Sequence, residues 1–242
     1  MGTVILLRHG RSTANGSGVL AGRMPGVELD DTGRRQARRL VERLSDVPLA
    51  ALVCSPLLRC EQTLEPLRTA RGLAPVTEPR LAEVDYGEWT GREIKSLVGE
   101  PLWPVVQQHP SAVVFPGGEG LAAMQARAVA AVRDHDARIT AEHGEHAVWA
   151  LCTHGDILKS LIADALGQHL DSFQRIMVEP ASLSVVRYAE TRPLVLRVND
   201  NGGDLGGIVP PPPAESEQAD PKTATSAGDA VVGGSTGRED HA

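Results

Sequence analysis

Three short apolar runs, each ended by a polar cluster, place the strongest constraint on the fold of this chain. Residues 4–7, 49–54 and 147–152 are uninterrupted apolar segments, and stretches with helical periodicity lie between them. A strand that is apolar on both sides has to be buried on both faces, which is typical of a parallel sheet covered by helices. We therefore predict an α/β fold, a three-layer α/β/α sandwich with a mostly parallel central sheet.

The segments between the runs carry apolar residues at helical spacing. Asp30 or Thr32 stands where a cap would begin a helix whose apolar face includes Ala37, Leu40 and Leu44. The same patterns predict helices over residues 57–70, from 121 to just before Gly144, and over 157–166, and two further strands over 182–188 and 194–198.

The composition changes at residue 199. Residues 199–242 contain no aromatic residue, include four consecutive prolines at 210–213, and carry a net charge of −6 out of −7 for the whole chain. Such a segment has too little apolar surface to offset the entropy lost on ordering. We predict a folded domain over residues 1–198 and a disordered acidic tail over 199–242.

Charge and cysteine content narrow the class of protein. Residues 1–198 have a net charge of about −1 and no basic run, which argues against nucleic acid as a partner. The apolar run at 4–7 is too short for a signal sequence or a membrane span. The three cysteines, Cys54, Cys60 and Cys152, are an odd number, which favours reduced thiols and a cytoplasmic location. The sequence does not indicate an oligomeric state.

Polar side chains follow all three predicted buried strands. Arg8 and His9 follow the first strand, Arg59 the second and His154 the third. Because the carboxyl ends of parallel strands meet at one edge of the sheet, we expect these four side chains to lie together. Arginine matches phosphate oxygens with a planar fork of donors, and a neutral histidine can attack phosphorus. The set predicts a site for phosphoryl chemistry.

The sequence also resembles a known family. The motifs that carry the resemblance are L-R-H-G at 7–10, S-P-L-L-R-C-E-Q-T at 55–63, L-A-E-V-D-Y-G-E-W at 81–89, P-G-G-E at 116–119 and T-H-G at 153–155. Their identity and order are similar to those of the histidine phosphatase superfamily, the phosphoglycerate mutase-like proteins of branch 1. A single R-H-G is a weak signal, but five elements in order over residues 4–155 are specific.

The resemblance implies a role for each matching residue. His9 would be the nucleophile that becomes phosphohistidine, and Glu83 would protonate the leaving oxygen and then activate water. The implied binding residues are Arg8, Asn15, Arg59 and His154 for the phosphoryl group, and Gly22 and Arg23 for the rest of the substrate. The family implies no metal and no cofactor, and the expected partner is a phosphorylated small molecule.

Three functions remain open. The first is a phosphomonoesterase, and the second is a phosphomutase that returns the phosphoryl group to its substrate. The related mutases carry a long basic insertion after the glutamate motif, whereas residues 92–115 here contain only Arg92 and Lys95 as fixed positive charges. The third is a non-catalytic phosphate-binding module, which typically lacks the nucleophile or the acid, although His9 and Glu83 are both present. We therefore favour the phosphomonoesterase.

Two other patterns have a simpler interpretation. His143 and His146 have the spacing of a metal pair, but they lie in a helix-to-strand connection that we expect to be solvated. Cys54 and Arg59 are separated by four residues, one of them proline, whereas a cysteine phosphatase needs five in a phosphate-binding loop. Neither pattern predicts a second active site.

The substrate-facing segment is expected to be variable. Position 11 is Arg, where relatives usually have Glu or Gln, so Arg11 adds positive charge near the pocket mouth or points to solvent. Residues 92–120 are expected to form a lid that determines the substrate. Trp89, Trp103 and Phe115 either line this lid or belong to the core.

Overall fold

The central element is a six-stranded sheet. The computed structural model describes residues 2–203, together with 232 and 233. The strand order is β3-β2-β4-β1-β5-β6. The strands are β1 (Thr3–Arg8), β2 (Leu49–Cys54), β3 (Val76–Thr77), β4 (Val148–Thr153), β5 (Leu183–Tyr188) and β6 (Pro193–Asp200).

Strand pairing fixes the edge at which the polar clusters emerge. The neighbouring pairs among β3, β2, β4 and β1 are all parallel, while β5 runs antiparallel to both β1 and β6. Arg8 is in register with Thr153, and Cys54 is in register with Cys152. The residues that follow β1, β2 and β4 therefore leave the sheet at the same edge, as expected for parallel strands.

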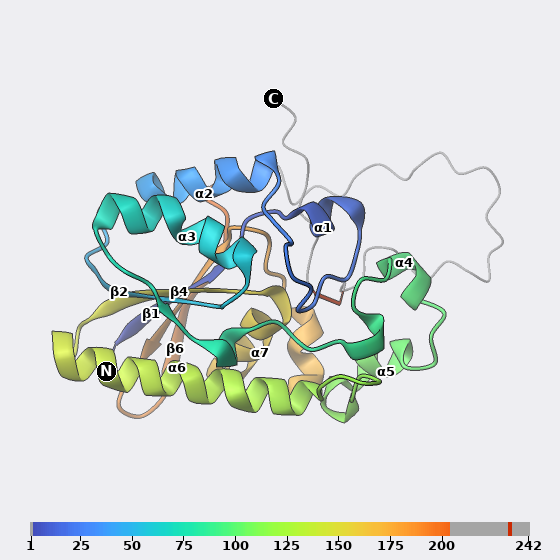
Figure 1. Cartoon of the computed structure of the whole chain (residues 1–242). Coiled ribbons are helices and arrows are strands. Elements are labelled where there is room, and N and C mark those ends of the chain that lie inside the picture. Colours follow the sequence, from blue (N-terminus) through green and yellow to red (C-terminus); the bar gives the residue numbers. More distant parts are fainter. Residues whose placement is uncertain (1, 204–231, 234–242) are drawn as a thin grey trace.

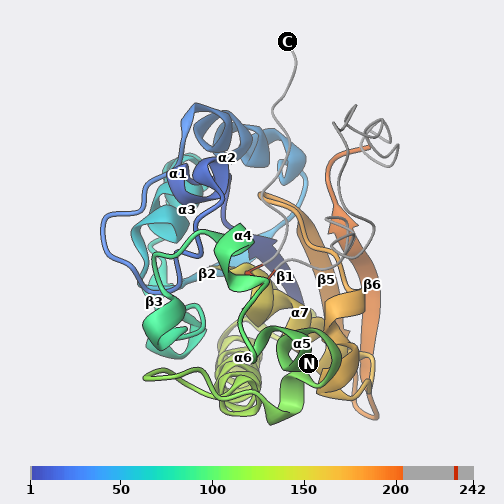
Figure 2. The same ribbon diagram turned by 90° about the vertical axis from the view of Figure 1, so that its right-hand side faces the viewer.

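Helices cover both faces of the sheet. In Figure 1, α2 and α3 lie above the sheet and α6 and α7 lie below it, and Figure 2 shows the same layers from one end. The longer helices are α2 (Asp31–Arg43), α3 (Leu58–Arg71), α6 (Leu121–His143) and α7 (Gly155–Ala165). The predicted three-layer α/β/α sandwich is confirmed.

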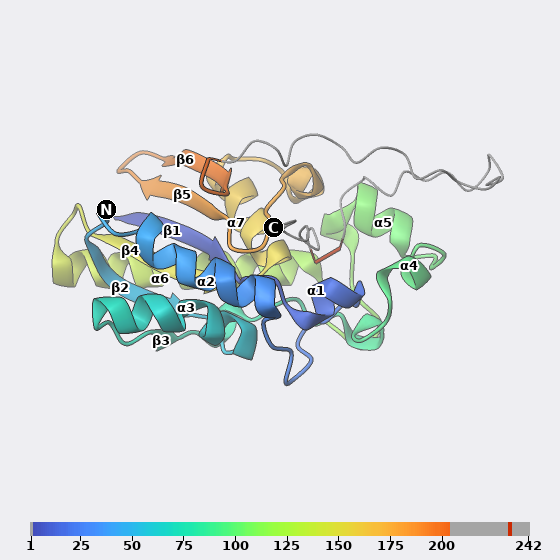
Figure 3. The same cartoon turned by 90° about the horizontal axis from the view of Figure 1, so that it is seen from above.

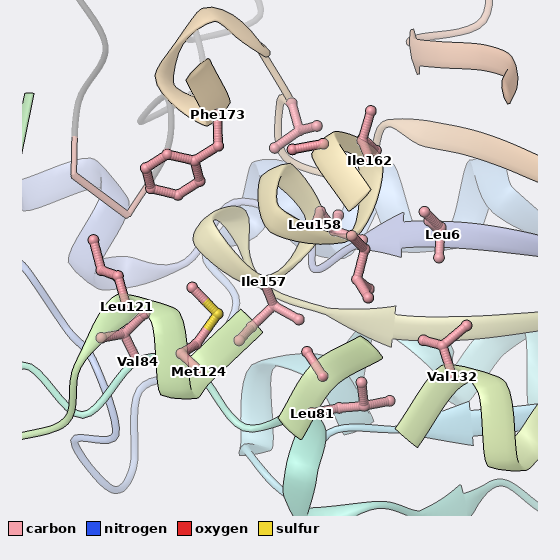
Figure 4. Close-up of a cluster of buried hydrophobic side chains, with 14 of the residues drawn as sticks. Leu6, Leu81, Val84, Leu121, Met124, Val132, Ile157, Leu158, Ile162 and Phe173 are labelled. Carbon is pink, nitrogen blue, oxygen red and sulfur yellow. The ribbon is translucent and has the colours of Figure 1, made fainter. Parts of the chain in front are cut away.

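Alternate residues of one strand belong to two separate cores. Val4 and Leu6 of β1 pack in the core between the sheet and helices α6 and α7, whereas Ile5 and Leu7 pack against α2 and α3. Figure 4 shows Leu6 with Met124 and Leu158 in the first of these cores. Both faces of the strand are buried, which explains why the sequence of β1 is continuously apolar rather than alternating.

The carboxyl edge of the parallel strands is surrounded by short elements. They are α1 (Thr13–Ser17), α4 (Ile94–Leu97), α5 (Trp103–Gln108), and the 3₁₀ turns η1 (Pro79–Leu81), η2 (Gly87–Trp89), η3 (Pro110–Ala112) and η4 (Leu170–Arg175). Figure 3 shows α1, α4 and α5 at one end of the sheet. Residues 232 and 233, drawn in red, lie at this same end.

The predicted helices and strands agree with the structure to within a few residues, and part of the predicted tail packs against the domain. Of the two predicted caps for α2, Asp30 accepts the hydrogen bond from the Gly33 backbone N–H. Strand β6 continues to Asp200, two residues past the predicted domain boundary at 198. Most of the predicted tail, 204–231 and 234–242, lies outside the described residues, whereas Val232 is buried against the domain. Within the described residues, no helix combines the length and hydrophobicity that a membrane span requires.

Candidate active site

His9 is held rigidly at the end of β1. Its backbone N–H donates to the Thr153 carbonyl at 2.9 Å, and its carbonyl accepts from the Ala181 N–H at 3.1 Å. The next residue has to be glycine, because a Cβ on Gly10 would lie 2.8 Å from the Gly33 carbonyl oxygen at the start of α2. The backbone on both sides of the imidazole is therefore fixed by the sheet and by α2.

The hydrogen bonds of His9 determine its tautomer. Nδ1 lies 2.7 Å from the Gly10 carbonyl, which can only accept, so Nδ1 carries the proton. Nε2 in turn lies 3.3 Å from the Nε–H donor of Arg59 and is the unprotonated nitrogen. Burial, then the charges of Arg59 and Arg8, lower the pKa of His9 well below its usual value. The ring is neutral at physiological pH, with a lone pair on Nε2.

Arg59 connects this imidazole to the loop that follows α1. It extends from the first turn of α3, is 2% exposed, and donates from Nη2 to the Gly22 carbonyl at 2.9 Å. Thr63 supports the same turn, because its hydroxyl donates to the Arg59 carbonyl and accepts from the Gly10 N–H. The S-P-L-x-R-x-x-x-T motif therefore places a guanidinium beside the His9 ring and braces it.

His154 lies opposite His9, with their ring centroids 5.3 Å apart. It is the residue immediately before α7, and its Nε2 is 2.7 Å from the Ser55 hydroxyl. Ser55 Oγ also accepts from the Leu57 N–H, which helps to hold the hydroxyl beside the ring. Burial, followed by Arg59, lowers the pKa of His154 well below its usual value. Two neutral imidazoles thus face one another at the edge of the sheet.

Glu83 is a buried acid whose pKa is raised to near neutral pH. Its side chain is 4% exposed, and its Oε1 accepts the Val84 backbone N–H at 2.9 Å. Burial first, and then the charge of Asp156, raise the pKa of Glu83 to about 7, although Arg59 and Arg8 oppose the shift. A carboxyl group with this pKa can both donate and accept a proton near neutrality.

Arg8 is completely buried and makes two long-range backbone contacts. Nη1 donates to the Val178 carbonyl at 2.8 Å and Nη2 donates to the Gly233 carbonyl at 3.1 Å. Burial lowers the pKa of Arg8 to about 10, which still leaves it charged at neutral pH. Its Nε finds no hydrogen-bond partner among the described residues. The guanidinium therefore retains one N–H donor, although Arg8 is not among the residues that line the pocket described below.

A pocket brings several of these groups together. Its polar lining includes His9, Arg59 and Glu83. The apolar lining residues are Val19, Leu20, Ala21, Ile94 and Val232. The pocket therefore combines reactive polar groups with apolar walls.

Three of the six residues predicted to contact phosphate or substrate line this pocket, and three do not. Asn15, Gly22 and Arg59 line it, whereas Arg8, Arg23 and His154 are not among its lining residues. Asn15 Oδ1 also accepts from the Ser12 N–H and hydroxyl, so this side chain caps α1 as well. Arg23 is not among the lining residues, because its Nε donates to the Glu83 carbonyl and Nη2 binds Glu119 at 2.8 Å. Arg23 braces the backbone that carries Glu83.

The structure also places the other residues that the sequence analysis singled out. Arg11 forms an ion pair with Asp30, its Nε 3.3 Å from the carboxylate. Of the three aromatic residues in question, Trp89 and Phe115 are buried in the core, and Trp103 packs against that core and stacks on Trp89. Within residues 2–203, 232 and 233, no group of three or more His, Cys, Asp or Glu side chains is arranged to hold a metal ion.

Two residues of the site were missed in the sequence analysis. Ser55 orients His154, and Asp156 raises the pKa of Glu83. Asp156 is 1% exposed and receives hydrogen bonds from the Tyr86 hydroxyl and from Lys159. The available signal was a charged pair, D-x-x-K, on the predicted apolar helix directly after T-H-G.

The sequence of this chain is similar to those of proteins named for phosphoryl chemistry. The chain is 29% identical to phosphoserine phosphatase 1 of Hydrogenobacter thermophilus over 199 residues, which cover 81% of this chain and 91% of that protein. It is 30% identical to a probable phosphoglycerate mutase, GpmB, of Yersinia enterocolitica, over 78% of this chain and 86% of that protein.

Solved structures and the family profile lead to the same grouping. The fold is similar to that of YhfR from Bacillus stearothermophilus, with a TM-score of 0.74, 28% identity, and coverage of 83% of this chain and 98% of that one. Residues 4–201 match the profile of the histidine phosphatase superfamily (branch 1), a range that includes all of the sheet except Thr3. With its motifs, fold and sequence matches in agreement, the chain belongs to the histidine phosphatase superfamily, branch 1.

Proposed function

We propose that this protein is a metal-independent phosphomonoesterase that acts through a phosphohistidine on His9. The observation that carries the proposal is the protonation pattern of the pocket. His9 Nε2 is unprotonated, and Glu83, with a pKa of about 7, lines the same pocket. A nucleophile and an acid in complementary protonation states are what the first chemical step requires.

In the first step, His9 Nε2 attacks phosphorus as the ester P–O bond breaks. Glu83 donates its proton to the departing oxygen, so the leaving group departs as a neutral alcohol. Nδ1 of His9 keeps its proton and its bond to the Gly10 carbonyl, which stabilises the positive charge that develops on the ring. Arg59, which already contacts Nε2, is placed to bind the transferring phosphoryl oxygens.

In the second step, water takes the place of the leaving group. The Glu83 carboxylate accepts a proton from water as the water oxygen attacks phosphorus and the P–N bond breaks. Inorganic phosphate leaves, His9 regains its lone pair and Glu83 regains its proton. One ester bond is hydrolysed for each molecule of water consumed.

The charges of residues 92–115 favour hydrolysis over a mutase reaction. A phosphoglycerate mutase has to hold a second anionic group of its substrate. The two basic residues of 92–115 are already paired, Arg92 with Glu100 at 2.6 Å and Lys95 with Glu93 at 2.8 Å. Five further residues that line the pocket, Val19, Leu20, Ala21, Ile94 and Val232, are apolar. We infer that the substrate is a phosphorylated small metabolite. We also infer a cytoplasmic location, because the three free thiols fit a reducing compartment.

Hydrolysis of p-nitrophenyl phosphate tests this proposal. We expect turnover by the wild type and a loss of at least about 1,000-fold in kcat for His9→Ala. His143→Ala, which removes an exposed histidine at the end of α6, is the matched control and should retain activity. Full activity of His9→Ala would contradict the proposal. A phosphoryl label that forms on the protein during turnover and survives acid would contradict it too, because phosphohistidine is acid-labile.

The mutase alternative needs a separate assay. Incubation with 3-phosphoglycerate and its bisphosphate primer should yield inorganic phosphate or no reaction. Efficient formation of 2-phosphoglycerate would replace the phosphatase with the mutase. Failure to hydrolyse any phosphomonoester, with the protein folded, would support a non-catalytic module instead.

A further inference from the structure

The P-G-G-E element at residues 116–119 has no part in the mechanism above. It ends two residues before α6, and the Glu119 N–H donates to the Asp85 carbonyl at 2.9 Å. Gly118 packs so closely on the same loop that a Cβ there would lie 2.2 Å from the Asp85 carbonyl oxygen. The element is therefore packed directly against the loop that carries Glu83.

The Glu119 carboxylate accepts hydrogen bonds from three residues. Its Oε1 accepts the Asp85 backbone N–H at 2.9 Å and Arg23 Nη2 at 2.8 Å. Arg127, in the second turn of α6, donates to both oxygens, from Nε to Oε2 at 3.0 Å and from Nη2 to Oε1 at 2.6 Å. Two parallel bonds of this kind between an arginine and a carboxylate fix the orientation of both groups.

Arg127 also binds the backbone that carries the acid. Its Nη1 donates to the Ala82 carbonyl at 2.8 Å, and its Nη2 donates to the Glu83 carbonyl at 3.3 Å. Arg23 Nε donates to the same Glu83 carbonyl at 2.8 Å. Two consecutive carbonyls of this loop, one of them belonging to the acid itself, are therefore tied to α6.

The Glu83 carboxyl group has little other support. Among the described residues its side chain makes one hydrogen bond, which Oε1 accepts from the Val84 N–H of the same loop. The carboxyl group therefore moves with its own backbone. A general acid has to reach the leaving oxygen at hydrogen-bond distance, and a displacement of about 1 Å can cost about 100-fold in rate.

We propose that Arg127 and Glu119 are positioning residues that hold the Glu83 carboxyl group where it can protonate the leaving oxygen. This inference rests on the proposed phosphatase function and adds the residues that orient its acid. Neither Arg127 nor Glu119 is among the residues that line the pocket, so both act through the loop rather than on the substrate.

Two substrates separate this role from a merely structural one. The propoxide that leaves n-propyl phosphate needs a proton, whereas p-nitrophenolate leaves readily as an anion. Because kcat/KM reports the first chemical step, displacement of the acid should slow the first substrate and spare the second. A loss of folded protein, or of the His9 nucleophile, would lower kcat/KM for both substrates by the same factor.

Arg127→Lys is the first variant, because lysine keeps the charge but cannot bind both oxygens of Glu119 and the backbone at once. We expect kcat/KM to fall about 100-fold for n-propyl phosphate and less than about threefold for p-nitrophenyl phosphate. Arg133→Lys is the matched control on the same helix, where Arg133 pairs with Asp164, and both rates should stay at their wild-type values. An equal loss for the two substrates, or no loss for either, would overturn the inference.

Glu119→Gln is the second variant and keeps the shape of the side chain. It removes the negative charge that binds Arg127 and Arg23, and it should show the same selective loss in kcat/KM. The pH profile adds a readout that a structural role would not change. In both variants the decline of kcat/KM for n-propyl phosphate above pH 7 should weaken, because the remaining rate depends less on the Glu83 proton. A decline as steep as that of the wild type would overturn the inference.

The two levels of inference fail in distinguishable ways. Hydrolysis of both substrates by the wild type, with an equal loss for both in the variants, would overturn the positioning role alone. Wild-type hydrolysis of p-nitrophenyl phosphate but of no alkyl phosphate would leave no proton transfer for these residues to serve, and would overturn the positioning role as well. An absence of hydrolysis for every substrate would overturn the phosphatase function, and the positioning role with it.

Discussion

Replacing Glu83 with glutamine should abolish turnover and, at the same time, stabilise the protein at alkaline pH. The native structure holds the Glu83 carboxyl in a buried site, where its pKa rises from 4.5 to about 7. Between these two values the unfolded chain releases a proton that the folded protein retains. The native state is therefore penalised increasingly as pH rises through this window, and the penalty is constant above it.

The size of this effect follows from the pKa values. A difference of about 2.5 pH units corresponds to about 3 kcal/mol of unfolding free energy at pH 8.5, and to less than about 1 kcal/mol at pH 5. Glutamine cannot ionise, and its carbonyl can still accept the Val84 N–H. Relative to wild type, Glu83→Gln should thus gain about 2.5 kcal/mol between pH 5 and pH 8.5.

Urea unfolding of both proteins at pH 5 and pH 8.5 measures this gain. Glu88→Gln, a change of an exposed glutamate five residues further on, is the matched control for losing one carboxylate from the same loop. A gain for Glu83→Gln that is the same at both pH values, or larger at pH 5, would refute the reasoning. It would mean that the Glu83 carboxyl ionises in the native protein much as it does in the unfolded chain.

The same ionisation should control catalysis. For an alkyl phosphate, whose leaving oxygen needs a proton, kcat/KM should fall about tenfold per pH unit above pH 7, as Glu83 loses its proton. The lowered pKa of His9 keeps the nucleophile neutral well below pH 6.5. A rate on n-propyl phosphate that is constant from pH 6 to pH 9 would contradict the assignment of Glu83 as the acid.

Three further substitutions test other contacts of the site. Arg59→Lys retains the charge but loses the fork that reaches both His9 and the Gly22 carbonyl, and kcat/KM should fall about 100-fold in a steady-state assay. Ser55→Ala removes the hydrogen-bond partner of His154 Nε2, so kcat/KM should fall about tenfold while the midpoint of thermal unfolding changes by only a few degrees. Gly233 lines the pocket, so its backbone should compete with substrate for space there. Gly233→Val cannot easily keep the φ of 82° found at Gly233, so KM should fall several-fold, and an unchanged or higher KM would argue against this competition.

Much of the fold could be predicted because its determinants are local and repeated. The apolar run at 4–7 is continuous because β1 is covered on both faces. Four residues were therefore enough to predict a buried strand. The elements that were missed lack this signal. Strand β3 has two exposed residues at the edge of the sheet, and α1 contains Asn and Gly and depends on the capping box between Ser12 and Asn15. Edge pairing and side-chain caps are made by tertiary or atomic contacts that periodicity does not record.

The candidate site was predictable to the extent that topology brings strand ends together. His9, Arg59 and His154 each follow a parallel strand, and the structure places all three within contact distance of a common partner or of each other. Arg23 shows the limit of this reasoning. It lies in the expected loop, but its guanidinium binds the Glu83 carbonyl and Glu119 rather than facing the pocket. A loop position predicts proximity, whereas the side-chain direction depends on which carboxylates are nearby.

Asp156, which raises the pKa of Glu83, shows why the tuning of the site is harder to predict than its reaction type. The phosphoryl chemistry depends on residues that lie next to strand ends, so a motif can identify them. The role of Asp156 depends on Tyr86, which is 70 residues away in the chain, and on Gly233, which is 77 residues away. Its oxygens are satisfied by Lys159, Tyr86 and Gly233, so the position of the carboxylate is set by contacts that no local motif records. A change at position 156 should therefore alter the pKa of Glu83 while the residues that contact His9 stay the same.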